Sequence, residues 1–198
     1  MIKNLILDNG NVLVKWDPNE IANLTFPEDK ETAKIYKEKV LEAKNWYFID
    51  SGKYTIEEVA KIFANQVDEK YREKILYAIR NFNKIIPILY KENEWVNEAK
   101  NKSFNIYILS NTNEKFVDML KRFPCKDSIS GYLTSYDSKL MKPDINIYKL
   151  LCKKYNLKPE ECMFIDDIKI NVDASLQAGY GKGLVYDGNI TKLYDILK

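Results

Sequence analysis

Several short segments of the chain place reactive side chains directly after runs of apolar residues. In the first of them, Leu5–Leu7 leads into Asp8 and then into a turn that contains Gly10 and Asn11. A carboxylate at the end of a buried strand can act as a nucleophile or bind a hard metal ion. Glycine in such a turn lets a ligand approach the backbone closely. Taken alone, Asp8 could equally be an acid that closes a strand.

The other segments supply a hydroxyl, an ammonium and a pair of acids. Ser110 and Asn111 follow a second apolar run, Lys142 lies in a polar loop, and Asp166 and Asp167 close another apolar run. Ser and Asn often cap a helix, and most lysines are solvated. Adjacent buried carboxylates, however, repel each other unless a cation or strong donors compensate. The combination of nucleophile, hydroxyl, lysine and acidic site, in this order, indicates chemistry on an anion.

The amino-acid composition excludes several classes of catalytic site. The chain of 198 residues contains no histidine, which excludes Ser-His-Asp, Cys-His and H-E-x-x-H sites. An enzyme of this composition must rely mainly on Asp, Glu, Lys, Ser, Cys or Tyr, and on a hard ion such as Mg²⁺. Its three cysteines, Cys125, Cys152 and Cys162, lie far apart without a C-x-x-C, so we expect neither disulfides nor a zinc site.

Charge and hydropathy argue against nucleic acid and membranes as partners. The 31 basic and 29 acidic residues are interspersed and sum to +2, so there is no broad basic field for nucleic acid. No apolar run reaches the roughly 18 residues that a membrane helix requires. The first residues lead straight into a short strand rather than a signal peptide. We therefore expect a cytoplasmic protein that binds neither membranes nor nucleic acid; its oligomeric state stays open.

Strand-like runs alternate with helical patterns along most of the chain. This alternation predicts an α/β fold with a doubly wound, mainly parallel sheet. Ligands bind beyond the carboxyl ends of the strands in such sheets, so the polar residues that follow the strands should converge on one crevice. The predicted strands are Asn4–Leu7, Phe104–Leu109, Gly131–Ser135, Cys162–Ile165 and Gly183–Val185.

Residues 15–82 differ from the remainder, because they are rich in Lys and Glu at helical spacing and contain no convincing strand. We interpret them as an inserted helical cap on a core formed by residues 1–14 and 83–198. Within the cap, Thr55 and Glu58 have the spacing of a capping box, which should start a helix. Pro87 should start or precede the helix that leads into the second strand.

The four reactive segments resemble the four sequence motifs of the haloacid dehalogenase-like (HAD) superfamily over nearly the whole chain. The resemblance implies a Rossmann-like core with a helical cap, Mg²⁺ as cofactor, and a small phosphorylated metabolite as substrate. The implied catalytic residues are Asp8, Ser110 and Lys142; the substrate-binding residues are Asn11, Ser110, Asn111 and Lys142; and the metal ligands are Asp8, Gly10, Asp166 and Asp167.

The residues within the motifs are most similar to those of one subgroup of this superfamily. D-x-G-N-V, L-S-N-T-N and M-K-P are closest to bacterial members regarded as α-D-glucose-1-phosphate phosphatases. This implies a Mg²⁺-dependent phosphomonoester hydrolase that works through an aspartyl-phosphate, on a small sugar phosphate such as glucose 1-phosphate. Two alternatives remain: a 2-haloacid dehalogenase, which would need no metal and leave the acid pair unexplained, and a catalytically silent binding protein with the HAD fold.

One position departs from the pattern of the phosphatases. They usually carry a second aspartate, the general acid and base, two residues after the nucleophile, where this chain has Gly10. Asp17 and Asp50 are candidate substitutes. Without a substitute, loss of the acid should lower the rate roughly 10²–10⁴-fold for poor leaving groups and least for acidic ones, which would favour sugar 1-phosphates. Asn171 stands where many members have a further acid, and its part in the metal shell stays open.

Overall fold

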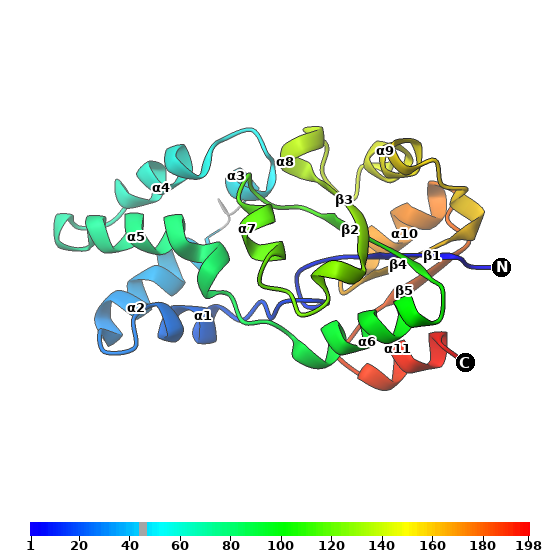
Figure 1. Cartoon of the computed structure of the whole chain (residues 1–198). Helices are drawn as coiled ribbons and strands as arrows, with labels where there is room; N and C mark the ends of the chain where they lie inside the picture. The colour runs from blue at the N-terminus through cyan, green and yellow to red at the C-terminus, as the bar shows by residue number, and fades with distance from the viewer. Residues whose placement is uncertain (44–46) are drawn as a thin grey trace.

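Five parallel strands form the centre of the computed structural model, which describes residues 1–43 and 47–198 (Figure 1). The strands lie in the order β3-β2-β1-β4-β5. Their bounds are Asn4–Leu7 (β1), Asn105–Ser110 (β2), Ile129–Thr134 (β3), Cys162–Asp166 (β4) and Lys182–Val185 (β5). The prediction of a doubly wound parallel sheet is confirmed, and the strand bounds differ from the predicted ones by two residues at most.

β1 lies at the centre of the sheet. Leu7 pairs with Ile108 of β2 on one side and with Ile165 of β4 on the other. All four residues of β1 and all five of β4 are buried, as continuous apolar runs in the sequence predict for strands covered on both faces. Asp8 and Asp167 follow directly after these two neighbouring strands, and Ser110 ends β2. Pairing in register therefore brings the reactive segments to one edge of the sheet.

Helices cover both faces of the sheet, and alternate strand residues face opposite layers. Ile6 belongs to the apolar cluster with α9 (Ile145–Tyr155) and α10 (Lys169–Gln177). Leu5 and Leu7 belong to the cluster with α6 (Tyr90–Asn101) and α11 (Ile190–Ile196). Shorter helices complete the core: α7 (Phe116–Leu120), α8 (Ser135–Ser138) and the 3₁₀ turns η3 (Lys126–Ser128) and η4 (Pro159–Glu161).

Helices fill most of the described part of the chain between residues 18 and 85, as the sequence predicts, and these are termed the cap helices. They are α1 (Pro18–Thr25), α2 (Lys30–Tyr36), the π-helical turn η1 (Lys37–Leu41), α3 (Tyr47–Asp50), α4 (Ile56–Ala64) and α5 (Glu69–Ile85). The predicted capping box is present, because Thr55 Oγ1 accepts from the Glu58 amide at 3.2 Å and Glu58 Oε2 accepts from the Thr55 amide at 2.8 Å. The predicted end of the cap at residue 82 falls inside α5. The division into two domains stays a prediction.

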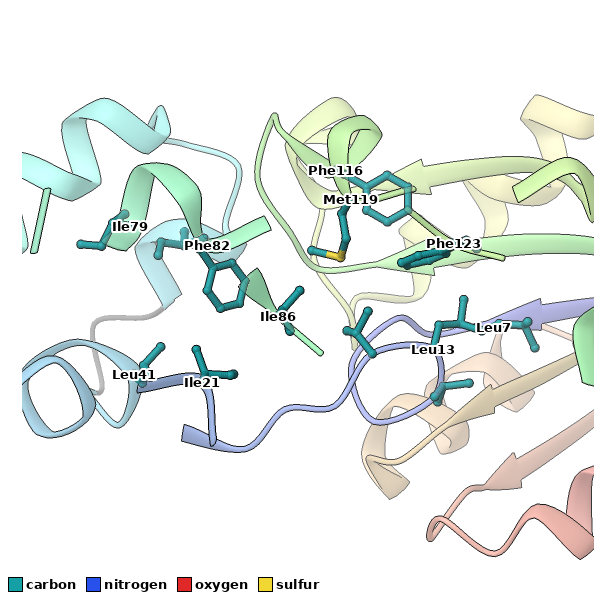
Figure 2. Close-up of a cluster of buried hydrophobic side chains, with 14 of the residues drawn as sticks. Leu7, Leu13, Ile21, Leu41, Ile79, Phe82, Ile86, Phe116, Met119 and Phe123 are labelled. Carbon is teal, nitrogen blue, oxygen red and sulfur yellow. The ribbon is translucent and has the colours of Figure 1, made fainter. Parts of the chain in front are cut away.

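One apolar cluster runs from the cap helices to the sheet without interruption. Figure 2 shows Leu41, Ile79 and Phe82 of the cap on one side, and Leu13 and Met119 of the core on the other. Burial of such surface stabilises by about 25 cal/mol per Å². This burial holds the cap helices against the end of the core that carries Asp8.

Two smaller expectations can be compared with the structure. All three cysteines are buried and free. Within residues 1–43 and 47–198, no helix combines the length and the apolarity needed to cross a membrane.

Candidate active site

The turn after β1 is held by its own backbone. Asn9 O accepts from the amides of Leu13 and Val14 at 2.8 and 3.0 Å, and the Asn11 amide donates to Val14 O at 2.7 Å. Asn11 has φ +52°, a left-handed conformation that asparagine tolerates better than most residues. The turn thus places Gly10 and Asn11 beside the carboxylate of Asp8, and both of them line a cavity.

Lys142 is the electrostatic centre of the site. Its Nζ lies 2.6 Å from Asp8 Oδ1 and 2.7 Å from Asp166 Oδ2, and all three side chains are at least nine-tenths buried. Burial alone would lower the pKa of Lys142, but the two carboxylates raise it, so the ammonium stays charged. Burial raises the pKa of Asp8 to about 7, and Lys142 opposes that rise.

The remaining acids have different surroundings. Asp166 accepts from Lys142 Nζ, from the Ile168 amide at 2.8 Å and from Asn171 Nδ2 at 3.1 Å, so its carboxylate is fully engaged. The carboxylate of Asp167 accepts from Asn11 Nδ2 at 2.9 Å and lines the cavity. Burial raises the pKa of Asp167, while the bond from Asn11 acts against this rise.

Three carboxylates are close enough to share a cation. One oxygen atom from each of Asp8, Asp166 and Asp167 lies within 4.8 Å of the others. Carboxylate and carbonyl oxygens are the ligands that Mg²⁺ prefers. The donor set fits such an ion, with the Asp8 and Asp167 side chains and Gly10 facing the cavity and Asp166 lying behind them.

Ser110 and Asn111 have separate positions in the site. Ser110 is buried and lines the cavity; its Oγ makes one long bond, at 3.4 Å to Asn111 O. The side chain of Asn111 is bound to the backbone of Lys142, because it accepts from the amide at 2.9 Å and donates to the carbonyl at 3.0 Å. Asn111 therefore fixes the loop that carries Lys142, whereas Ser110 keeps a hydroxyl available.

The cavity has a volume of about 340 Å³ and lies between the sheet edge and the cap helices. Its core side is polar and includes Asp8, Ser110, Lys142 and Asp167. Its cap side is mainly apolar, with Trp16, Leu41, Ile49, Phe82 and Ile86. Such a site can bind an anion at its base and a small organic group above it. The sequence alone did not indicate which cap residues face the cavity.

The structure separates the two candidate acids. Asp17 caps α1, where its Oδ1 accepts from the amides of Asn19 and Glu20 at 3.0 and 3.1 Å; these bonds lower the pKa of Asp17. Asp17 does not line the cavity. Asp50 does, on the cap side, at the end of α3. Burial, reinforced by the nearby charge of Asp8, raises the pKa of Asp50 to about 8.

The turn that carries Asp50 is bound to the core by residues that the sequence did not single out. Ser135 Oγ donates to Asp50 O at 2.5 Å and accepts from the Thr112 amide at 2.8 Å. Lys139 Nζ donates to Gly52 O at 2.5 Å. Gly52 has φ +65°, a conformation that glycine adopts readily, but no pattern in the sequence links Ser135 or Lys139 to this turn.

Gly10 differs from what its place in a turn suggests. Its φ lies outside the left-handed region, and no heavy atom would lie within 4 Å of a Cβ atom built there. The missing side chain is therefore not dictated by backbone strain or by lack of space. Neither the backbone conformation nor a close neighbour therefore opposes a side chain at this position.

Known proteins resemble this chain over most of its length. A D-ribitol-5-phosphate phosphatase of Bacteroides thetaiotaomicron is 22% identical over 188 residues, which cover 91% of this chain and 90% of that protein. The solved structure of a HAD family enzyme from the same organism, in complex with magnesium and inorganic phosphate, has a TM-score of 0.71 at 22% identity and covers 96% of both chains. That of an L-2-haloacid dehalogenase from Xanthobacter autotrophicus has a TM-score of 0.65 at 19% identity, covering 92% of this chain and 76% of its own.

At these identities, the solved structures establish the fold rather than the reaction. Family membership comes from the sequence, because the sequence model for haloacid dehalogenase-like hydrolases matches residues 2–179, which include every segment of the site. The chain therefore belongs to the haloacid dehalogenase-like hydrolase family.

Proposed function

We propose that this protein is a Mg²⁺-dependent phosphomonoester hydrolase that acts on a small phosphorylated metabolite. The observation that supports this most strongly is the cluster of Asp8, Lys142, Asp166 and Asp167 at the floor of a cavity. A buried lysine between acids is suited to an anion, and the acids are suited to a hard cation. A phosphate ester with its metal ion requires both.

In this proposal, Mg²⁺ is held by the carboxylates of Asp8 and Asp167 and the carbonyl of Gly10, and when bound it neutralises charge on the phosphoryl oxygens. Asp166 acts mainly on the position of Lys142, because its oxygens are engaged by Lys142, Ile168 and Asn171. The sequence assigned Asp166 to the metal ligands, and that assignment stays a proposal.

The reaction proceeds in two displacements at phosphorus. An oxygen of Asp8 attacks the phosphoryl group in line, the bond to the leaving alcohol breaks, and an aspartyl-phosphate forms. Lys142 and the Ser110 hydroxyl hold the equatorial oxygens while charge moves onto them. Water then attacks the same phosphorus, the bond to Asp8 breaks, and inorganic phosphate leaves.

The cavity restricts the substrate by size. About 340 Å³ is near the lower end of the range for ligand sites, so a phosphate with a short carbon skeleton fits best. We propose two candidate substrates. Glucose 1-phosphate follows from the wording of the motifs, and a pentitol 5-phosphate follows from the activity named for the ribitol-5-phosphate phosphatase. Among the described residues, those of the cap that line the cavity are mainly apolar. They favour neither substrate, because selective binding of hydroxyl groups depends on polar partners.

Release of phosphate from a panel of sugar and polyol phosphates, with and without Mg²⁺, tests the proposal. We expect turnover with Mg²⁺ for at least one member and none for Asp8→Asn. The haloacid dehalogenase alternative predicts the opposite pattern: halide release from a 2-haloacid that survives chelation, with no phosphate release. Absence of both activities would support a binding protein.

A further inference from the structure

The cavity contains one carboxyl group that the proposed displacement does not use. Among the described residues that line it, the carboxylic acids are Asp8, Asp50 and Asp167. Asp8 is the nucleophile in the proposed function, and Asp167 is a metal ligand. No acid is available at Gly10, two residues after the nucleophile. Asp50 is therefore the one lining acid, within the described residues, without an assigned role.

We propose that Asp50, supplied by the cap, is the general acid and base of this enzyme and performs the task that a carboxyl at position 10 would perform. This inference rests on the proposed phosphatase function. It makes Asp50 a catalytic residue, because its carboxyl would contact the leaving-group oxygen and then the attacking water.

The position of Asp50 is set by the core as well as by the cap. Its carbonyl accepts from Ser135 Oγ, and Ser135 is itself bound to Thr112, two residues after Ser110. Two further bonds hold the same turn, from Lys139 Nζ to Gly52 O at 2.5 Å and from the Ile56 amide to Glu114 Oε1 at 2.7 Å. An acid that acts at a reacting centre must be held in this way.

The surroundings of Asp50 suit a proton donor. Its carboxyl has no hydrogen-bonding partner among residues 1–43 and 47–198, so no described contact draws it away from the cavity. Asp8 and Lys142 line the same cavity, and their opposite charges act on Asp50 in opposite senses: Asp8 raises the pKa of Asp50 and Lys142 lowers it. Asp50 is only partly exposed and lines the cavity, and its desolvation there favours the neutral form of the acid.

The proton balance is complete with Asp50 alone. As the P–O bond to the alcohol breaks, the Asp50 carboxyl gives its proton to the bridging oxygen, so a neutral alcohol leaves and Asp50 becomes a carboxylate. In the second step this carboxylate removes a proton from the water that attacks phosphorus. Asp8 is released, inorganic phosphate forms, and Asp50 is protonated again. The net reaction consumes one water per ester.

The dependence of rate on the leaving group tests this role. With Mg²⁺ present, kcat/KM is measured for Asp50→Asn with an alkyl phosphate, such as glucose 6-phosphate, and with p-nitrophenyl phosphate. We expect a loss of roughly 10²–10⁴-fold for the alkyl ester and of less than about 10-fold for the aryl ester, whose leaving group needs no proton. Asp17→Asn is the matched control, because this acid lies outside the cavity, and it should leave the ratio of the two rates unchanged.

Pre-steady-state kinetics examine the second half of the cycle. With the aryl ester, Asp50→Asn should release a burst of p-nitrophenol close to one equivalent per enzyme, because phosphorylation stays fast while hydrolysis of the aspartyl-phosphate has lost its base. An equal loss on both esters without a burst would overturn the role of Asp50, and so would unchanged rates.

Two further variants keep the test decisive. Asp50→Glu retains a carboxyl and should keep the ratio of alkyl to aryl rates within about 10-fold of wild type, even if both rates fall. Gly10→Asp, for which the structure has room, should restore alkyl phosphate turnover to Asp50→Asn by at least about 10-fold. Failure of both would contradict the inference. Failure of the phosphatase function itself is distinct, since the wild type would then release no phosphate from any ester.

Discussion

Gly52 in the cap turn and Tyr136 in the core are in backbone contact: a Cβ atom at position 52 would lie 2.4 Å from the Cα atom of Tyr136. Real Cβ atoms essentially never approach that closely, and neither backbone can give way as the end of a side chain could. Gly52 also has φ +65°, which opposes any side chain. Gly52, which makes this contact, lies two residues after Asp50.

Gly52→Ala should therefore lower kcat strongly while it lowers the free energy of unfolding only moderately. The left-handed backbone should lower the free energy of unfolding by about 1–2 kcal/mol. The clash should displace the cap turn from Tyr136 and lower kcat for an alkyl phosphate by about 10-fold or more. Gly188→Ala is the control, because Gly188 has φ +84° with no heavy atom within 4 Å of the added Cβ. Equal kcat for both variants would show that the contact does not matter for turnover.

Asp8→Asn should abolish phosphate release while the protein stays folded. The substitution removes the attacking charge but conserves volume, so kcat should fall by roughly 10³–10⁶-fold, as for other nucleophiles. Circular dichroism and a melting curve check the fold. Asp173→Asn changes an exposed acid that pairs with Lys169 on α10, and it should behave as wild type. Appreciable turnover by Asp8→Asn would refute the assignment of the nucleophile.

Lys142→Met should be strongly destabilising. It leaves the buried carboxylates of Asp8 and Asp166 without their shared cation, and such a loss lowers the free energy of unfolding by about 3–5 kcal/mol. Lys192→Met removes an exposed partner of Asp187 and should change it by no more than about 1 kcal/mol. Urea denaturation of both variants gives the comparison. Similar midpoints would mean that the buried network contributes little to stability.

Removal of metal should change stability as well as activity. Mg²⁺ at about 100 times its dissociation constant should raise the free energy of unfolding by about 2.7 kcal/mol, and EDTA should reverse both this gain and turnover. Asp167→Asn removes one of the acids that face the cavity, so its melting temperature should no longer respond to Mg²⁺. A normal Mg²⁺ response in this variant would place the ion elsewhere.

Asp50→Asn should stabilise the metal-free protein at neutral pH. The folded-state pKa of Asp50 is raised from 3.8 to about 8, so the folded state binds the proton more tightly than the unfolded state does. The stability that this proton contributes is full below pH 3.8 and is lost as the pH rises to about 8. The variant lacks this loss, and near pH 7.5 it should melt roughly 2–8 °C higher than wild type.

The measurement compares melting temperatures in EDTA at pH 5 and pH 7.5. The advantage of Asp50→Asn over wild type should shrink at the lower pH, because less of the stability contributed by the Asp50 proton has been lost there. The raised pKa of Asp8 is common to both proteins and cancels in the comparison. A difference that is independent of pH would show that Asp50 is not buried as a neutral acid.

Much of the fold follows from patterns that act over short distances. Continuous apolar runs identify β1, β2 and β4 as central strands, and the capping box at Thr55 and Glu58 starts α4 as predicted. Asp8, Ser110 and Asp167 could be placed together because the carboxyl ends of neighbouring parallel strands meet at one edge.

The choice between Asp17 and Asp50 could not be made in the same way, because it depends on how the cap helices dock on the core. Asp17 precedes Pro18 at the start of α1, a local signal of an N-cap that explains this acid structurally. Nothing local distinguishes Asp50, whose position depends on Ser135 and Lys139, more than 80 residues further along the chain. Contacts of that kind leave no periodicity in the sequence.

The central position of β1 also has a consequence for synthesis of the chain. Asn4 pairs with Asn105 on one side and Cys162 on the other, so β1 is synthesised before both of its partners and has both edges open until they have been made. At about 5–20 residues per second, translation from β1 to the end of β4 takes roughly 8–30 s. Meanwhile the cap helices can form from neighbouring residues. Asp8 is thus synthesised well before Asp167, and the two can lie side by side only once the fourth strand is complete.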